Sequence, residues 1–235
     1  MEMEMRDPIW IQGLLGLHVA AGATAFLFAP LALATRKGAP AHRRWGRIYF
    51  WAMAVVAASA IILSAWRPIL FLALVAVFSF YAAFSAYRVL HMKNLGRGGS
   101  PGWLDWAAAC FTFSSSLLLA TLGWLRPAWV QHMGIVPIVF GFLGMSLGAG
   151  RIYRFLRPPD DRMFWWYDHL QGMLASYIAA WTAFSVVTLS RFLGHGWLVW
   201  LWPTIVGAPA IALTKAYYKR KFALKSSKNR PVQAV

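Results

Sequence analysis

The chain has 235 residues, of which 60% are hydrophobic and only 13% are charged. A soluble domain has about 45–50% apolar and about 25% charged residues, so this composition excludes an ordinary soluble globule and a disordered chain. The formal net charge is +16, from 23 Lys and Arg residues against 7 Asp and Glu residues. In a soluble protein this charge would indicate nucleic-acid binding. In this chain, the placement of the basic residues decides whether the charge serves nucleic-acid binding or membrane topology.

Seven apolar segments follow one another, each long enough to cross a membrane. A helix rises about 1.5 Å per residue, so about 20 residues span the hydrocarbon core. Backbone polar groups in lipid must be paired within their own segment, which predicts helices. We place them at residues 11–35, 48–66, 69–90, 107–125, 135–156, 170–190 and 197–218. The predicted fold is therefore all-α, a polytopic membrane helix bundle. Residues 1–218 form one transmembrane domain, and residues 219–235 form a basic cytoplasmic tail.

The first helix is expected to be retained. A secretory signal peptide opens with a positive segment before a short apolar core. This chain opens with Met-Glu-Met-Glu-Met-Arg-Asp, and the apolar run that follows is too long for such a core. The single cysteine, Cys110, excludes an intramolecular disulfide and a multi-cysteine metal or iron–sulfur site.

The basic residues alternate between the two sides of the predicted bundle. The connections after helices one, three and five and the C-terminal tail carry 19 of the 23 Lys and Arg residues, and the opposite side carries Arg6, Arg67, Arg126 and Arg191. Lys and Arg concentrate in cytoplasmic loops, so the N-terminus is predicted outside and the C-terminus inside. The charge is then explained by anionic lipid headgroups at the inner face, without nucleic acid. We expect a multi-pass protein of a bacterial inner membrane.

Two histidines are candidates for holding a cofactor. His18 lies inside the first helix, with small neighbours Ala21 and Gly22 on the same face, which favours contact with another helix. His169 begins the sixth helix on a stripe of small and polar residues that is expected to face inward. Ionisable residues inside a membrane tend to be functional. A satisfied interhelical hydrogen bond is the alternative for His18. The two histidines lie at different depths and cannot share one haem.

A divalent metal site is predicted on the inner side, from His42, His91 and His169 with Asp105. These residue types suit a divalent metal, and Asp105 or Asp168 would orient an imidazole. No two of these histidines have short ligand spacing. The alternatives are therefore interfacial histidines without a metal, and Asp168 as the N-cap of the sixth helix.

Further polar residues are expected inside the bundle. Helix three carries Tyr81, Ser85 and Arg88 on one stripe, and Arg88 is expected to extend to the inner headgroups. Tyr81 and Ser85 need partners, for which helix four offers Ser114 and its neighbours, Cys110, Thr112, Ser115 and Ser116. Gly144 and Gly148 predict close helix packing. Pro203 and Pro209 predict that the seventh helix is irregular.

Three short motifs resemble those of an uncharacterised bacterial family of predicted multi-pass integral membrane proteins with a domain of unknown function. They are His18-x-x-x-Gly22 with His42-Arg43-x-x-Gly46-Arg47-x-Tyr49, His169-x-x-Gly172-Met173-x-x-Ser176-Tyr177, and Trp202-Pro203-Thr204 with Gly207-x-Pro209. The resemblance implies a helical inner-membrane protein and no established activity. It directs attention to His18, His42 and His169.

The sequence favours a histidine-centred redox protein, with haem b or a quinone, or a metal-associated protein. Histidines are its only ionisable groups well away from the basic flanks, because all seven carboxylates lie at or beyond the predicted helix ends. A small-molecule or lipid transporter is the first alternative, and a zinc-dependent membrane lipid hydrolase or an accessory subunit of a membrane complex are further ones. The chain is also compatible with a homo-oligomer. The residues alone do not decide whether it is an enzyme.

Overall fold

The computed structural model describes residues 7–126, 133–194 and 196–228, with side chains as far as residue 223. It is helical throughout, without a β-strand in these residues. The elements are α1 (Ile9–Ala34), α2 (Pro40–Trp66), α3 (Leu70–Arg88), the short 3₁₀ helix η1 (Val89–His91), α4 (Trp103–Leu125), α6 (Val136–Leu156), α7 (Phe164–Leu193) and α8 (Trp197–Lys228). Seven helices are long and apolar enough to cross a membrane, which confirms the seven predicted spans.

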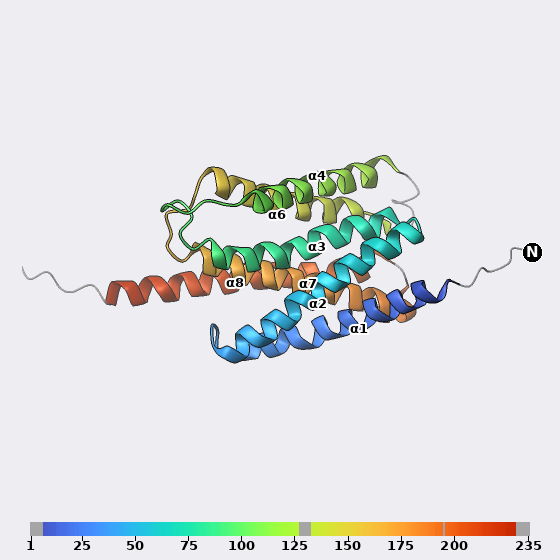
Figure 1. The fold of residues 1–235 in the computed structure, drawn as a ribbon, viewed down its shortest axis with the longest axis horizontal. Coiled ribbons are helices and arrows are strands. Elements are labelled where there is room, and N and C mark those ends of the chain that lie inside the picture. The colour runs from blue at the N-terminus through green and yellow to red at the C-terminus, as the bar shows by residue number, and fades with distance from the viewer. Residues whose placement is uncertain (1–6, 127–132, 195, 229–235) are drawn as a thin grey trace, which may run out of the picture.

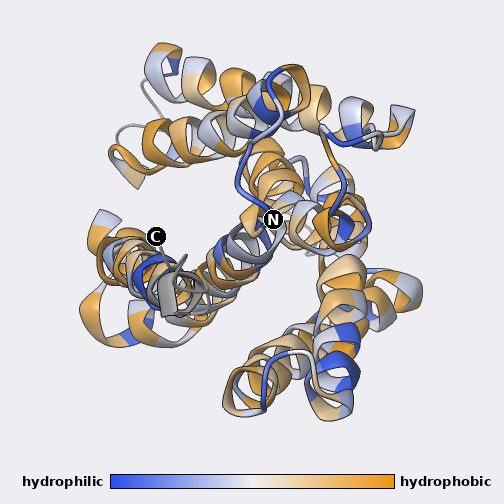
Figure 2. Cartoon of the chain, turned by 90° about the vertical axis from the view of Figure 1, so that its left-hand side faces the viewer, coloured by the Kyte–Doolittle hydropathy of each residue, from blue (hydrophilic) through white to orange (hydrophobic). Residues whose placement is uncertain are grey.

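The bundle is built from three helical hairpins around one central helix. The hairpins α1/α2, α4/α6 and α7/α8 are each formed by consecutive helices, and α3 packs against α2, α4, α6 and α7. Viewed along the helices, the three hairpins extend outward from the centre as separate arms (Figure 2). The first and third arms also touch each other, through α1 and α7.

Small side chains fill the contacts between helices, and large apolar side chains face outward. Buried residues include Ala25, Ala83 and Ser116, whereas Trp51 and Phe111 are more than half exposed, as expected for a surface that meets lipid. The contact between α4 and α6 is close enough to require glycine. A Cβ atom on Gly144 would lie 2.8 Å from the Ser116 Cβ. This confirms the packing role predicted for the glycines of α6.

Four helices begin earlier than predicted, and the difference is largest for α2 and α7. Helix α2 starts at Pro40, which occupies its first position, and α7 starts at Phe164. These first turns carry basic and aromatic residues, which suit the membrane interface but lower the hydropathy on which the predicted boundaries rest. As a result His42 lies in the first turn of α2, and Asp168 lies within α7 and not at its cap.

Helix α8 is one continuous α-helix with Pro203 and Pro209 inside it, and a bend at these prolines stays a prediction. Membrane helices tolerate proline because neighbouring groups satisfy the freed backbone carbonyls. The helix also runs on to Lys228, so residue 218 marks no break in secondary structure.

The connections rich in Lys and Arg all lie at one end of the bundle. We call it the basic end: it holds the α1–α2, α3–α4 and α6–α7 connections and the C-terminal end of α8, all at the left of Figure 1. The other end holds residue 7 and the α2–α3 connection. The alternation predicted from the sequence is thus present in the fold, and the orientation in the membrane stays a prediction.

Reporter fusions test that orientation. A reporter placed after Ala234, and another placed within residues 36–47, should both report the cytoplasm because the positive connections stay on that side. Alkaline phosphatase and green fluorescent protein fusions give opposite readouts for the two compartments. A periplasmic signal from either position would contradict the proposed orientation.

Candidate functional site

A pocket of about 780 Å³ opens at the basic end between the first and third arms and the end of α3. Its volume lies within the range of about 300–1,000 Å³ that is typical of ligand and cofactor sites. His42, His91 and His169 all line it, so three histidines that the sequence places at the same end of the bundle meet at one pocket. Its wall is aromatic, with Tyr49, Tyr87, Trp165, Trp166 and Tyr177.

His42 and His169 form a pair across this pocket. Their ring centroids lie 6.3 Å apart, with the ring planes at 77°. The Nδ1 atom of His42 lies 2.9 Å from the carbonyl oxygen of Ala32, and that of His169 lies 2.9 Å from the carbonyl oxygen of Ala86. A carbonyl oxygen only accepts hydrogen bonds, so in each ring Nδ1 carries the proton and donates it. The Nε2 atom of each ring then keeps its lone pair.

His91 lies at the exposed rim of the pocket. It follows α3 in η1, and its ring packs against Tyr87 with 5.5 Å between the centroids. Within the described residues, no three His, Cys, Asp or Glu side chains gather closely enough to hold a metal ion. The structure therefore brings His42, His91 and His169 to one pocket without forming the multidentate set that was predicted.

Asp105 does not join the histidines. Its two carboxylate oxygens accept hydrogen bonds from Nε and a terminal nitrogen of Arg88, both at 2.8 Å, and one of them also accepts the Gly102 amide at 3.0 Å. Asp105 is thus the cap of α4 and the partner of Arg88. The predicted metal-ligand role of Asp105 is not supported, and the headgroup contact predicted for Arg88 is replaced by an interhelical ion pair.

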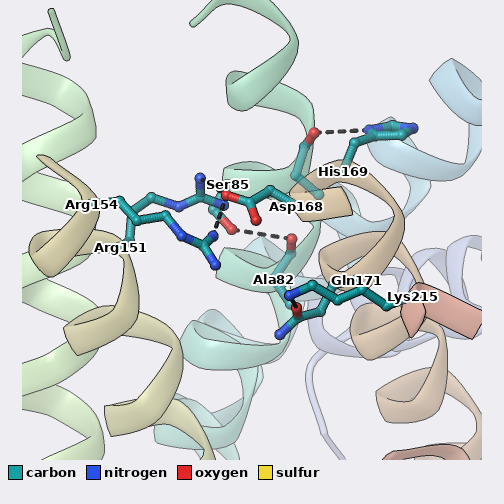
Figure 3. A network of polar contacts seen from close by, with 9 residues as sticks. Ala82, Ser85, Arg151, Arg154, Asp168, His169, Gln171 and Lys215 are labelled. Atoms are coloured by element: carbon teal, nitrogen blue, oxygen red, sulfur yellow. Dashed lines mark hydrogen bonds and ion pairs between the residues drawn. The ribbon is translucent and has the colours of Figure 1, made fainter. Parts of the chain in front are cut away.

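Asp168 forms a buried ion pair with two arginines of α6. Its side chain is 3% exposed and accepts a hydrogen bond from Arg151 at 3.1 Å and a second contact from Arg154. Asp168 and His169 point to opposite sides of α7, the first toward α6 and the second away from it (Figure 3). The predicted N-cap role is therefore wrong, and Asp168 does not orient the His169 imidazole.

The predicted polar stripe on α3 finds few partners. The Ser85 hydroxyl donates to the carbonyl of Ala82 at 3.4 Å, and the buried Tyr81 hydroxyl has no partner among the described atoms. Ser114 is exposed, so it does not reach Tyr81. Consecutive helical residues differ by about 100°, and Ser115 and Ser116 occupy the buried face of α4.

His18 faces the bundle, as predicted, but far from the pocket. Its Nδ1 lies 2.9 Å from the Ser59 hydroxyl oxygen of α2, and Ser59 donates its own proton to the Val55 carbonyl at 2.6 Å. His18 is therefore the donor in an interhelical hydrogen bond. It precedes the last residue of α1 by about 24 Å along the helix, so it shares no ligand with His169.

The pocket is positively charged. Lys37, Arg43, Arg47 and Lys93 line it, and no Asp or Glu does. Lys37 donates to the carbonyl of Leu33 in the last turn of α1, and partial burial lowers the pKa of its ammonium group. Lys93 lies 4.5 Å from the centre of the Trp165 ring. Arg43 and Arg47 have exposed side chains.

The sequence did not predict the contact between Tyr49 and Ser176, which joins the first and third arms beside the pocket. Their hydroxyl oxygens lie 2.6 Å apart, and the Ser176 hydroxyl donates to the Met173 carbonyl, so Tyr49 is the donor between them. Tyr49 ends a basic stretch and Ser176 lies on the predicted small stripe, but neither pattern identifies the other as its partner.

Comparison with family models, with curated proteins and with solved structures found no match to this chain. The class of protein therefore follows from the fold itself. The fold has the features of a multi-pass membrane protein: seven apolar helices, small residues where the helices meet, and large apolar residues on the outside. The family resemblance of the three short motifs stays a prediction.

Proposed function

We propose that this chain is a membrane-embedded redox protein whose cofactor contains a transition metal held by His42 and His169. One observation carries the proposal. Both rings donate Nδ1–H to a backbone carbonyl and leave Nε2 free in a single pocket. Metal-binding histidines almost always have such a second partner, which fixes the ring orientation and raises the basicity of the other nitrogen.

The position of the pocket suits transfer of single electrons at a membrane surface. It opens beside aromatic residues at the basic end, and two separate arms supply the ligands. A metal held there by His42 and His169 would supply one-electron chemistry at the membrane surface. A zinc hydrolase requires three protein ligands, which the described residues do not provide.

Metal content of the detergent-purified full chain tests this proposal. The unmodified protein should retain a redox-active metal, and His42→Ala together with His169→Ala should remove it. His91→Ala is the matched control because His91 lies at the rim of the same pocket, and this variant should keep the metal. Equal metal content in all three proteins, or none in any of them, would overturn the proposal.

A further inference from the structure

The spacing of the two imidazoles indicates which kind of centre the pocket takes. A nitrogen ligand lies about 2.0 Å from its metal, and the ring centroid lies about 1.1 Å farther out. Two imidazoles on opposite sides of one iron would therefore have centroids about 6.2 Å apart, whereas two on a tetrahedral ion would have centroids about 5.1 Å apart. The observed separation is 6.3 Å.

The wall of the pocket suits a flat, largely apolar molecule. Between the two arms the lining is aromatic and aliphatic, with Tyr49, Leu170, Met173 and Tyr177 below the histidines. Ring planes at 77° are compatible with opposite axial positions, because each axial imidazole rotates about its own metal–nitrogen bond. A planar tetrapyrrole would supply the remaining ligands in the plane between the two imidazoles.

The rim of the pocket favours a ligand that carries negative charge. Lys37, Arg43, Arg47 and Lys93 surround the opening and no carboxylate balances them. Lys37 follows α1 and donates to the carbonyl of Ala32, which also accepts a hydrogen bond from His42, so a cation and a proposed ligand are fixed at one place. A tetrapyrrole with two carboxylate side chains would pair with these cations, and a neutral quinone offers no such interaction.

From these observations we infer that the cofactor is haem b, with His42 and His169 as its two axial ligands and its propionates directed to the basic rim. This inference rests on the proposed function and specifies its cofactor. It commits the site to a six-coordinate iron and excludes His18, which lies in another part of the bundle.

Haem titration of the purified full chain tests the inference. We expect one haem per chain, with a sharp Soret band and a reduced α band typical of six-coordinate iron after addition of dithionite. His42→Ala and His169→Ala should each remove an axial ligand and give a five-coordinate spectrum or lose the haem, and His91→Ala and His18→Ala should keep the six-coordinate spectrum. His169→Met separates ligation from folding, because methionine also ligates haem iron and should raise the reduction potential and not abolish binding.

A comparison of haem with its dimethyl ester tests the contacts proposed for the propionates. Haem dimethyl ester lacks the two negative charges and should bind about tenfold more weakly than haem, because the charge-assisted contacts are lost. Arg43→Gln with Arg47→Gln should weaken haem binding and leave the ester unaffected, and Arg157→Gln at the same end is the control. Equal binding of haem and its ester would overturn the placement of the propionates.

The two proposals fail in different ways. A metal that is retained through His42 and His169 without a Soret band would leave the redox proposal standing and overturn the haem inference. A Soret band that is unchanged in both histidine variants would overturn both, and so would a protein that takes up neither haem nor metal.

Discussion

Replacing Asp168 with asparagine should destabilise the folded protein by about 3–5 kcal/mol, because it leaves a buried arginine without its counter-charge. The carboxylate of Asp168 is 3% exposed and its partner Arg151 is 9% exposed, so water compensates neither group. Thermal unfolding in detergent, followed by helix content and by size-exclusion chromatography, measures the loss.

Asp7→Asn is the matched control for this substitution. Asp7 pairs with Arg67, whose side chain is 60% exposed, so losing that pair should cost at most about 1 kcal/mol. Adding Arg151→Met to Asp168→Asn should recover part of the stability, since it removes the unpaired buried charge. The ion-pair explanation is wrong if Asp168→Asn and Asp7→Asn lower the melting temperature equally.

The second large effect is expected at Gly172, where α7 crosses the central helix. A Cβ atom there would lie 2.7 Å from the Ala86 Cβ and 2.8 Å from the Ala82 carbonyl oxygen. A leucine side chain must therefore push α7 away from α3, which costs about 3 kcal/mol in a close-packed interior. His169 lies one turn earlier and is bonded to the carbonyl of Ala86, so the pocket is distorted as well.

Gly150→Leu provides the comparison, because a Cβ at Gly150 meets nothing within 4 Å. It should leave both the melting temperature and the ligand affinity near those of the unmodified protein. Gly172→Leu should lower both. A stable Gly172→Leu protein with unchanged affinity would show that the contact between α3 and α7 does not position His169.

The seven spans, and the placement of three histidines at the same end of the bundle, were predictable from the sequence for a simple reason. Apolar length and the alternation of basic connections determine which end of each helix lies where, and His42, His91 and His169 all follow or precede connections of the same end. The small residues next to His18 on its helix face predicted that His18 faces another helix. These are properties of a single helix or of its ends.

The ion pairs were not predicted, because they depend on which faces of two helices meet. Arg88 pairs with Asp105 and Arg151 pairs with Asp168, in both cases 17 residues apart and across a connection at the basic end. A carboxylate near the start of one helix, opposite an arginine near the end of the preceding one, is the signal that would have identified them. Hydropathy alone also placed the starts of α2 and α7 too late, which made Asp168 look like a cap.

The arrangement of arms has a consequence for how the protein is made. The ribosome synthesises the first arm early. The hydrogen bond between Tyr49 and Ser176 forms only after Ser176, 127 residues later in the chain, has been synthesised. At about 5–20 residues per second, that interval lasts about 6–25 s. During this interval the first arm and α3 are already in the bilayer, and His169, the partner of His42, has not yet been inserted. Insertion therefore precedes completion of the pocket, and a ligand can be held by both His42 and His169 only after α7 has packed against α3.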